Sequence, residues 1–156
     1  MYTYNVYQER VPMTWTYNNE LVTEIPRNMM GFVYLITCKT TNRKYIGKKL
    51  FLFAKTSVRT VTLKSGIKKK KKIHSKFESD WKDYYGSSLE LSADIEKLGK
   101  ENFTREILHL CESKSHCSYI EAREQFERRV LESKEYYNGQ IQCRIHKGHI
   151  IPKVLK

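Results

Sequence analysis

Two short runs of alternating residues lie close together in the chain, and they constrain its fold more than any other feature. The runs cover about 32–38 and 44–50, and five residues of turn composition (KTTNR) separate them. A hairpin with this register brings Tyr34 and Tyr45 close together, next to a pair of lysines. Two phenols in such a place suit phosphodiester cleavage, but strands also favour aromatic residues that merely pack a sheet. The rest of the chain has to decide between these interpretations.

The positive charge of the chain is concentrated in one stretch. The formal net charge is +12, and the window from Arg43 to Lys76 contains thirteen Lys or Arg and no Asp or Glu. A localised basic patch predicts a polyanionic partner. A solvated lysine-rich loop or a solubility device is the alternative. We favour nucleic acid because the patch begins inside the second tyrosine run.

Length and composition indicate a single globular domain. The chain has 156 residues, of which 40% are hydrophobic and 29% charged. No apolar run approaches the roughly 18 residues of a membrane span, and the first thirty residues have no signal-peptide pattern. Four cysteines without an export signal indicate free thiols in a reducing compartment. We therefore expect a cytoplasmic protein without a membrane partner.

The pattern along the chain predicts a compact α/β (α+β) domain with a central three-stranded antiparallel sheet and helices on its faces. An accessory hairpin is expected within residues 1–30, with Asn18 and Asn19 in its turn. The basic stretch 51–72 is predicted to be irregular. Its block of five lysines is expected to be mobile without a ligand, because like charges repel one another. A basic tail is expected at 141–156. The other expected elements are helices at about 75–85, 88–98 and 118–133 and a third strand at 103–111.

The last of these helices has two possible faces. Its apolar stripe is predicted to contain Tyr119, Ala122, Phe126 and Val130. Glu124 lies on a neighbouring face, in a helix rich in Glu and Arg.

An ordered set of four residues carries a resemblance to a known family. Tyr34 and Tyr45 are eleven positions apart, Glu124 follows on the last predicted helix, and Asn138 comes fourteen residues later. The segments that match in between are GSSL at 86–89 and FTREIL at 103–108. Over residues 31–140 the chain resembles the GIY-YIG nucleases, and it looks closest to phage-type and homing-type members.

The resemblance implies a metal-dependent hydrolytic site. Glu124 is the expected metal ligand, and Glu121, one turn earlier, is its rival. One carboxylate is a sparse set of donors, which suits Mg²⁺ (or Mn²⁺) with water and phosphate oxygens completing its shell. The resemblance further implies that one tyrosine takes the proton from the attacking water. We favour Tyr34 as this base.

Each of these assignments has a structural alternative. Glu124 could simply form an ion pair with Arg128 at i+4, and Asn138 could supply only an Asn-Gly turn. We expect Lys48 and Lys49, on the strand of the second tyrosine, to favour the phenolate and so to lower the phenol pKa.

The chain departs from the family pattern just after the second tyrosine. The family usually has an arginine there, on a helix, that contacts the scissile phosphate, whereas this chain has the basic stretch. Arg59 is the only arginine between Gly47 and Arg105 and is our candidate for this role. The residues expected to grip the DNA backbone are Lys48, Lys49, Lys55, Lys68, Lys69, Lys70, Lys71, Lys72 and His74.

The functional hypothesis is a metal-dependent DNA endonuclease that acts on double-stranded DNA, as a nickase or as a double-strand cutter. It would work as a monomer or homodimer, in the host cell cytoplasm if the chain is encoded by a phage. Two alternatives stay open. One is a DNA-binding module on the same scaffold with impaired catalysis. The other is a structure-specific nuclease of repair or junction processing.

Overall fold

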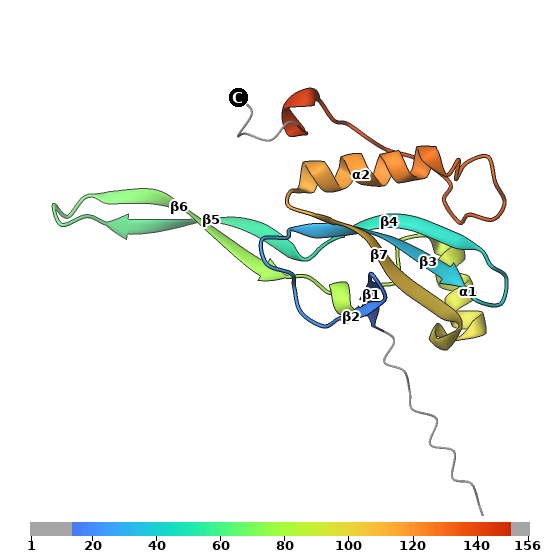
Figure 1. The fold of residues 1–156 in the computed structure, drawn as a ribbon. Coiled ribbons are helices and arrows are strands. Elements are labelled where there is room, and N and C mark those ends of the chain that lie inside the picture. Colours follow the sequence, from blue (N-terminus) through green and yellow to red (C-terminus); the bar gives the residue numbers. More distant parts are fainter. Residues whose placement is uncertain (1–13, 151–156) are drawn as a thin grey trace, which may run out of the picture.

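The computed structural model describes residues 14–150, which form a five-stranded sheet, a separate two-stranded sheet and two α-helices (Figure 1). The strands are β1 (Trp15–Tyr17), β2 (Glu20–Val22), β3 (Gly31–Cys38), β4 (Lys44–Leu50), β5 (Leu52–Thr62), β6 (Lys68–Glu78) and β7 (Phe103–Cys111). The α-helices are α1 (Leu89–Leu98) and α2 (Lys114–Glu127), and the 3₁₀ turns are η1 (Trp81–Asp83), η2 (Lys100–Asn102) and η3 (Lys147–His149).

The centre of the fold is the antiparallel pair β3–β4, with β7 antiparallel on the other side of β3. The strands predicted at 32–38, 44–50 and 103–111 are all present. Alternate residues of β3 enter two different cores. Phe32 and Tyr34 pack on one face of the sheet with Trp15 and Trp81, and Val33 packs on the other face against α2. The sheet therefore separates two apolar layers.

The sheet is larger than the three strands we expected, because β1 and β2 extend it. The chain order across it is β2-β1-β7-β3-β4. Strand β1 joins β7 in parallel at Thr16 and Glu106. Trp15 is fully buried, and its indole Nε1 donates to the carbonyl oxygen of Trp81 at 2.7 Å. Burial of this large side chain draws the β1–β2 hairpin into the body. The rest of the expected segment 1–30, before residue 14, and the end of the tail lie outside the described residues.

Helix α2 differs from the prediction in its ends and in its buried face. It begins at Lys114, where the side chain of Ser113 accepts from the backbone N–H of His116 at 3.1 Å, and it ends at Glu127 rather than at 133. Of the four residues expected on the apolar stripe, Ala122 and Val130 are buried, but Tyr119 and Phe126 are exposed. The residues buried on α2 are Cys117, Ile120, Ala122, Glu124 and Gln125. The neighbouring face, which carries two polar residues with hydrogen-bond partners, is the one that meets the sheet.

The basic stretch is the largest correction to the predicted fold. It is a regular hairpin in which all eleven residues of β5 pair with the eleven of β6, and the helix expected at 75–85 is replaced by the end of β6 and η1. Figure 1 shows the hairpin projecting from the body. Successive residues of a strand point to opposite faces. The five consecutive lysines are therefore divided between two faces, which lowers their mutual repulsion.

Helix α1 matches the prediction. Ser88 caps its start by accepting from the backbone N–H of Leu91 at 3.3 Å, and Gly99 ends it at φ 89°. Within residues 14–150, no helix combines the length and the apolar character that crossing a bilayer requires.

Candidate active site

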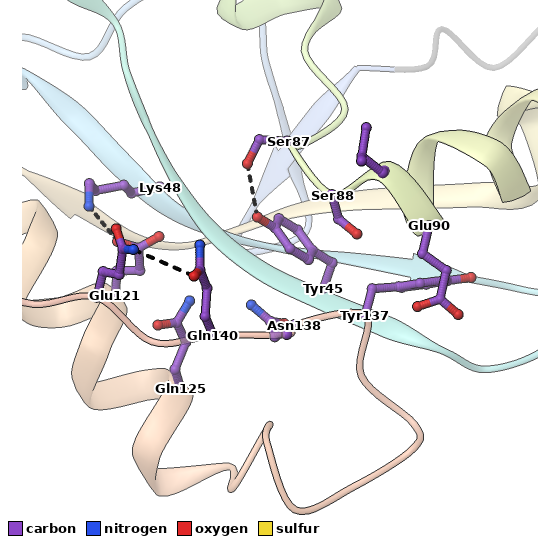
Figure 2. A pocket seen from close by; sticks show the side chains of 13 residues that line it. Tyr45, Lys48, Ser87, Ser88, Glu90, Glu121, Gln125, Tyr137, Asn138 and Gln140 are labelled. Carbon is purple, nitrogen blue, oxygen red and sulfur yellow. Dashed lines mark hydrogen bonds and ion pairs between the residues drawn. The ribbon is translucent and has the colours of Figure 1, made fainter.

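A pocket of about 580 Å³ opens between the edge strand β4, the start of α1 and the part of α2 that carries Glu121 and Gln125 (Figure 2). The chain segment after α2 closes its fourth side. The residues that line it are Tyr45, Lys48, Ser87, Ser88, Leu89, Glu90, Glu121, Gln125, Tyr137, Asn138, Gly139, Gln140 and Gln142. It gathers two phenols, two carboxylates and one ammonium group from four separate parts of the chain.

Tyr45 presents its phenol to this pocket from β4. The ring lies against Gly86, where a Cβ atom would approach two of its carbons to 3.2 Å, and the φ of Gly86 is 89°. The hydroxyl group lies 3.1 Å from Oγ of Ser87. Burial raises the pKa of Tyr45, although the hydrogen bond with Ser87 acts in the opposite direction. The Gly86–Ser87 turn therefore positions a phenol that is protonated at neutral pH.

Tyr34 is adjacent to Tyr45 but does not reach the pocket. Their ring centroids are 6.1 Å apart, as the predicted hairpin register required. Tyr34 is only 1% exposed, and its hydroxyl lies across Gly47, where a Cβ atom would be 2.5 Å from it. Burial, followed by the charges of Tyr84 and Tyr45, holds the pKa of Tyr34 well above its usual value. Because Tyr34 is buried and does not line the pocket, an attacking water has no access to its oxygen.

Lys48 and Lys49 of β4 do not act on the phenols as we predicted. Lys48 points toward α2, and its Nζ lies 2.5 Å from Oε2 of Glu121. Lys49 points to the opposite side of the sheet, where its Nζ lies 2.7 Å from Oδ1 of Asp80. Each ammonium charge is thus balanced by a carboxylate. The expected lowering of the phenol pKa is wrong, because burial outweighs these paired charges.

The rival carboxylate, Glu121, is the one that the fold brings to the pocket. Its side chain is 14% exposed and lines the pocket together with Gln125, one turn further along α2. After burial, which is the largest cause, the charge of Glu121 also raises the pKa of Tyr34 and Tyr45. Glu121 therefore shares the pocket with Tyr45.

Glu124 lies on the neighbouring stripe of α2 and does not line the pocket. Its Oε1 is 2.7 Å from Nε2 of His109 on β7, and its Oε2 accepts from Nε of Arg128 at 2.9 Å. Burial alone would raise the pKa of Glu124, but these two partners together lower it. Both of its oxygens are thus engaged within the fold.

Asn138 reaches the pocket wall but uses its amide to hold the chain. Its Nδ2 donates to the carbonyl oxygen of Ile46 at 2.7 Å, and its Oδ1 accepts from the backbone N–H of Ile46 at 3.0 Å. Gln125 donates to the same carbonyl oxygen at 3.1 Å. The backbone N–H of Tyr137 donates to the carbonyl oxygen of Lys44 at 2.8 Å. This segment therefore continues the sheet beyond β4, and no Asn-Gly turn forms.

The remaining predicted site residues lie on the β5–β6 hairpin and not at the pocket. They are Lys55, Arg59, Lys68, Lys69, Lys70, Lys71, Lys72 and His74. Arg59 is exposed and opposite Lys71, and His74 is hydrogen-bonded to Thr56 at 3.0 Å. Among residues 14–150, no arginine side chain lines the pocket. The hairpin thus separates the basic residues from the phenol and the carboxylates.

Sequence reasoning missed most residues that line the pocket, and three of them make contacts that shape it. Ser87 lies in the segment GSSL that matches the family, but no role in the site was predicted for it, although it contacts the Tyr45 hydroxyl. Gln125 follows Glu121 by four positions on α2, so both side chains lie on one face of the helix. This spacing could have indicated that the two residues line the same pocket. Tyr137 donates from its hydroxyl to Oδ2 of Asp94 at 2.7 Å, and nothing in the local sequence pointed to this long-range contact.

The donors at the pocket suit a sparsely held hard cation. Within residues 14–150, no group of three or more His, Cys, Asp or Glu side chains gathers around a common centre. Glu121 supplies a carboxylate at an open pocket, and amide and hydroxyl groups surround it. Mg²⁺ accepts one or two carboxylates when water and phosphate oxygens complete its shell. The residues present therefore fit such an ion.

Comparison with known protein families identifies a matching family. A protein-family model described as "Putative endonuclease segE, GIY-YIG domain" matches residues 15–141. Searches of curated proteins and of solved structures found nothing that matches. The matched region contains both sheets, both α-helices and all residues named above as lining the pocket except Gln142.

Proposed function

The chain belongs to the GIY-YIG nuclease family, and from this premise we propose that it is a metal-dependent endonuclease that hydrolyses DNA at the pocket of Tyr45 and Glu121. The observation that carries the proposal is the meeting of a phenol, a carboxylate and an ammonium group in one open pocket. The exposed basic hairpin beside the body supports double-stranded DNA as the substrate. With one pocket per chain, cutting both strands requires a dimer or two successive visits.

Each side chain has a role that its surroundings support. Tyr45 acts as the general base in its phenolate form, in which its oxygen accepts the proton of the attacking water, and the hydroxyl of Ser87, 3.1 Å away, orients that oxygen. Lys48 offers a positive charge to the phosphate when it exchanges its pairing with Glu121. Asn138 is a positioning residue, because it holds the pocket wall to Ile46. Tyr34 packs beneath Tyr45 and supports its ring.

Glu121 is the residue that would hold Mg²⁺ (or Mn²⁺), in place of Glu124. When bound, such an ion polarises the phosphoryl group and stabilises the leaving oxygen. Glu121 faces the pocket, whereas both oxygens of Glu124 already have partners. We therefore assign the metal to the carboxylate that a phosphate can approach.

Nicking of supercoiled plasmid in Mg²⁺ tests this assignment, with Glu121→Gln and Glu124→Gln as a matched pair on one helix. We expect Glu121→Gln to abolish nicking and Glu124→Gln to retain it, and EDTA to stop the wild-type reaction. Loss of nicking in a folded Glu124→Gln protein, with normal nicking by Glu121→Gln, would return the metal to Glu124.

A DNA-binding module without catalysis is the second candidate. It is favoured by the lack of any arginine lining the pocket among residues 14–150, because a lysine cannot form the forked contact that arginine makes with phosphate. This candidate predicts salt-sensitive DNA binding and no nicking with Mg²⁺ or Mn²⁺. Nicking by the wild-type protein rules it out.

We place this activity in the cytoplasm, in keeping with the state of the cysteines. All four cysteines are free, and Cys38, Cys111 and Cys117 are buried. Free thiols are typical of proteins in reducing compartments.

A further inference from the structure

The β5–β6 hairpin has equal basic charge on its two faces. The strands are paired so that the even-numbered residues of both strands share one face and the odd-numbered residues the other. The even face carries Lys68, Lys70, Lys72 and Lys76, and the odd face carries Lys55, Arg59, Lys69 and Lys71. No Asp or Glu occurs from Leu52 to Phe77. A ribbon that lay flat on a phosphate backbone would need charge on one face only.

The dimensions of this ribbon match a groove of duplex DNA. Each strand has eleven residues, which at about 3.3 Å per residue spans roughly 36 Å. This length is about one helical turn of B-form DNA. The major groove is about 12 Å wide and admits a two-stranded β-ribbon. A ribbon inside it faces a phosphate wall on each side, which accounts for charge on both faces.

The root of the hairpin is fixed to the body, so the ribbon has a set direction relative to β4. Phe51, between β4 and β5, is fully buried, with its ring 4.7 Å from Phe32 and 5.0 Å from Trp81. Its carbonyl oxygen accepts from the backbone N–H of Ser79 at 2.8 Å, just after β6. Both strands are thus anchored where they leave the sheet that carries Tyr45.

From these observations we propose that the β5–β6 hairpin enters the major groove of B-form DNA, with the even face toward one phosphate strand and the odd face toward the other. The identity of the partner as DNA rests on the proposed nuclease function. Val58 and Val61, which are 60% and 36% exposed and lie on opposite faces, add apolar side chains that can meet thymine methyl groups. Double-stranded RNA is disfavoured, because side chains cannot read its deep and narrow major groove.

The salt dependence of DNA binding tests the two-faced contact, with the full-length protein in EDTA and a 30-bp duplex. The even-face triple variant is Lys68→Gln, Lys70→Gln and Lys72→Gln, and the odd-face triple is Arg59→Gln, Lys69→Gln and Lys71→Gln. Each should reduce the slope of log K against log salt by about 2.7, because each phosphate contact contributes about 0.9. All six positions are exposed, so the fold should persist.

The matched control removes three exposed lysines of the body, as Lys97→Gln, Lys114→Gln and Lys134→Gln. It should leave the slope close to that of the wild type. If only one of the hairpin triples changes the slope, the ribbon lies on the backbone and the proposal is wrong.

Chemical footprinting identifies the groove. Dimethyl sulfate should be blocked at guanine N7, in the major groove, over about one turn of DNA. Protection of adenine N3, in the minor groove, would overturn the proposal, as would equal competition by an RNA duplex of the same length. Plasmid nicking by the same preparations is scored separately. Absence of nicking with intact N7 protection would refute the nuclease and not the ribbon, and nicking without N7 protection would refute the ribbon alone.

Discussion

At the scale of single residues, the position of a strand in the sheet decides which tyrosine is available for chemistry. Tyr34 and Tyr45 lie on the same face of the sheet, with their ring centroids 6.1 Å apart. Tyr34 is on β3, between β7 and β4, and is covered by Trp15. Tyr45 is on β4, which is the edge strand, so that it borders the pocket. Two phenols that look equivalent in the sequence thus differ in access to water.

Substitution of each tyrosine by phenylalanine separates these roles. Tyr45→Phe should lower the single-turnover nicking rate by about 10²–10⁴-fold, which is the usual contribution of a general base. Tyr34→Phe should nick nearly as well as the wild type and lose about 1 kcal/mol of unfolding free energy with its hydroxyl hydrogen bond. Because burial raises the pKa of Tyr45, its phenolate fraction and the wild-type rate should increase from pH 7 to 9. If Tyr34→Phe lowers the nicking rate more than Tyr45→Phe does, Tyr34 and not Tyr45 is the general base.

At the scale of elements, the segment after α2 acts as a short extension of the sheet. Asn138 makes two hydrogen bonds with the backbone of Ile46. The backbone N–H of the preceding residue, Tyr137, donates to the carbonyl oxygen of Lys44. These contacts fix one wall of the pocket against the outer edge of β4. An asparagine is needed because the site requires one donor and one acceptor from the same small side chain.

Replacement of the Asn138 amide by a carboxylate tests whether this side chain holds the segment after α2 to β4. In Asn138→Asp the side chain cannot donate to the carbonyl oxygen of Ile46, and a charge is placed at a site only 9% exposed. We expect a loss of about 2–3 kcal/mol in unfolding free energy, measured by urea denaturation. Gln140→Glu, at an exposed position of the same segment, is the control and should be neutral. Equal stability of both variants would mean that Asn138 does not hold the wall.

At the scale of the whole molecule, the chain consists of a packed body and a charged hairpin that contributes little to its core. From Phe53 to Glu78 none of the residues is buried, and β5 and β6 pair only with each other. The stretch 55–75 contains eight of the Lys and Arg residues and no acidic residue. The buried core that stabilises the fold therefore lies in the body, whereas much of the excess positive charge lies in the hairpin.

Removal of the hairpin should separate these two properties. Residues 55–75 can be replaced by Asn-Gly, because Ala54 and Lys76 are cross-strand partners that a two-residue turn can join. The net charge falls from +12 to +4. We expect the melting temperature to stay within a few degrees and DNA affinity to fall, with a smaller dependence on salt. If the variant unfolds, the hairpin is needed for the stability of the body. If it binds DNA as tightly as the wild type, the body and not the hairpin provides the DNA affinity.

Much of this architecture follows from local patterns in the chain. Alternation predicted β3 and β4, and the local pattern of the chain predicted β7 and α1, because strands and helices depend on residues that are near one another in sequence. The spacing of the two tyrosines with the later segments was also sufficient to indicate the family, which the family match confirms.

The tertiary structure decided the features that depend on distant partners. The lysine block became a strand because it pairs across the hairpin with β5, whereas local charge repulsion suggested irregular chain. Glu121 rather than Glu124 faces the pocket because Glu124 is engaged by His109 and Arg128. Local sequence patterns were sufficient to predict β3, β4 and β7, the family and the location of the charge. Packing alone decided which phenol and which carboxylate share the pocket, because burial and pairing arise only when remote elements meet.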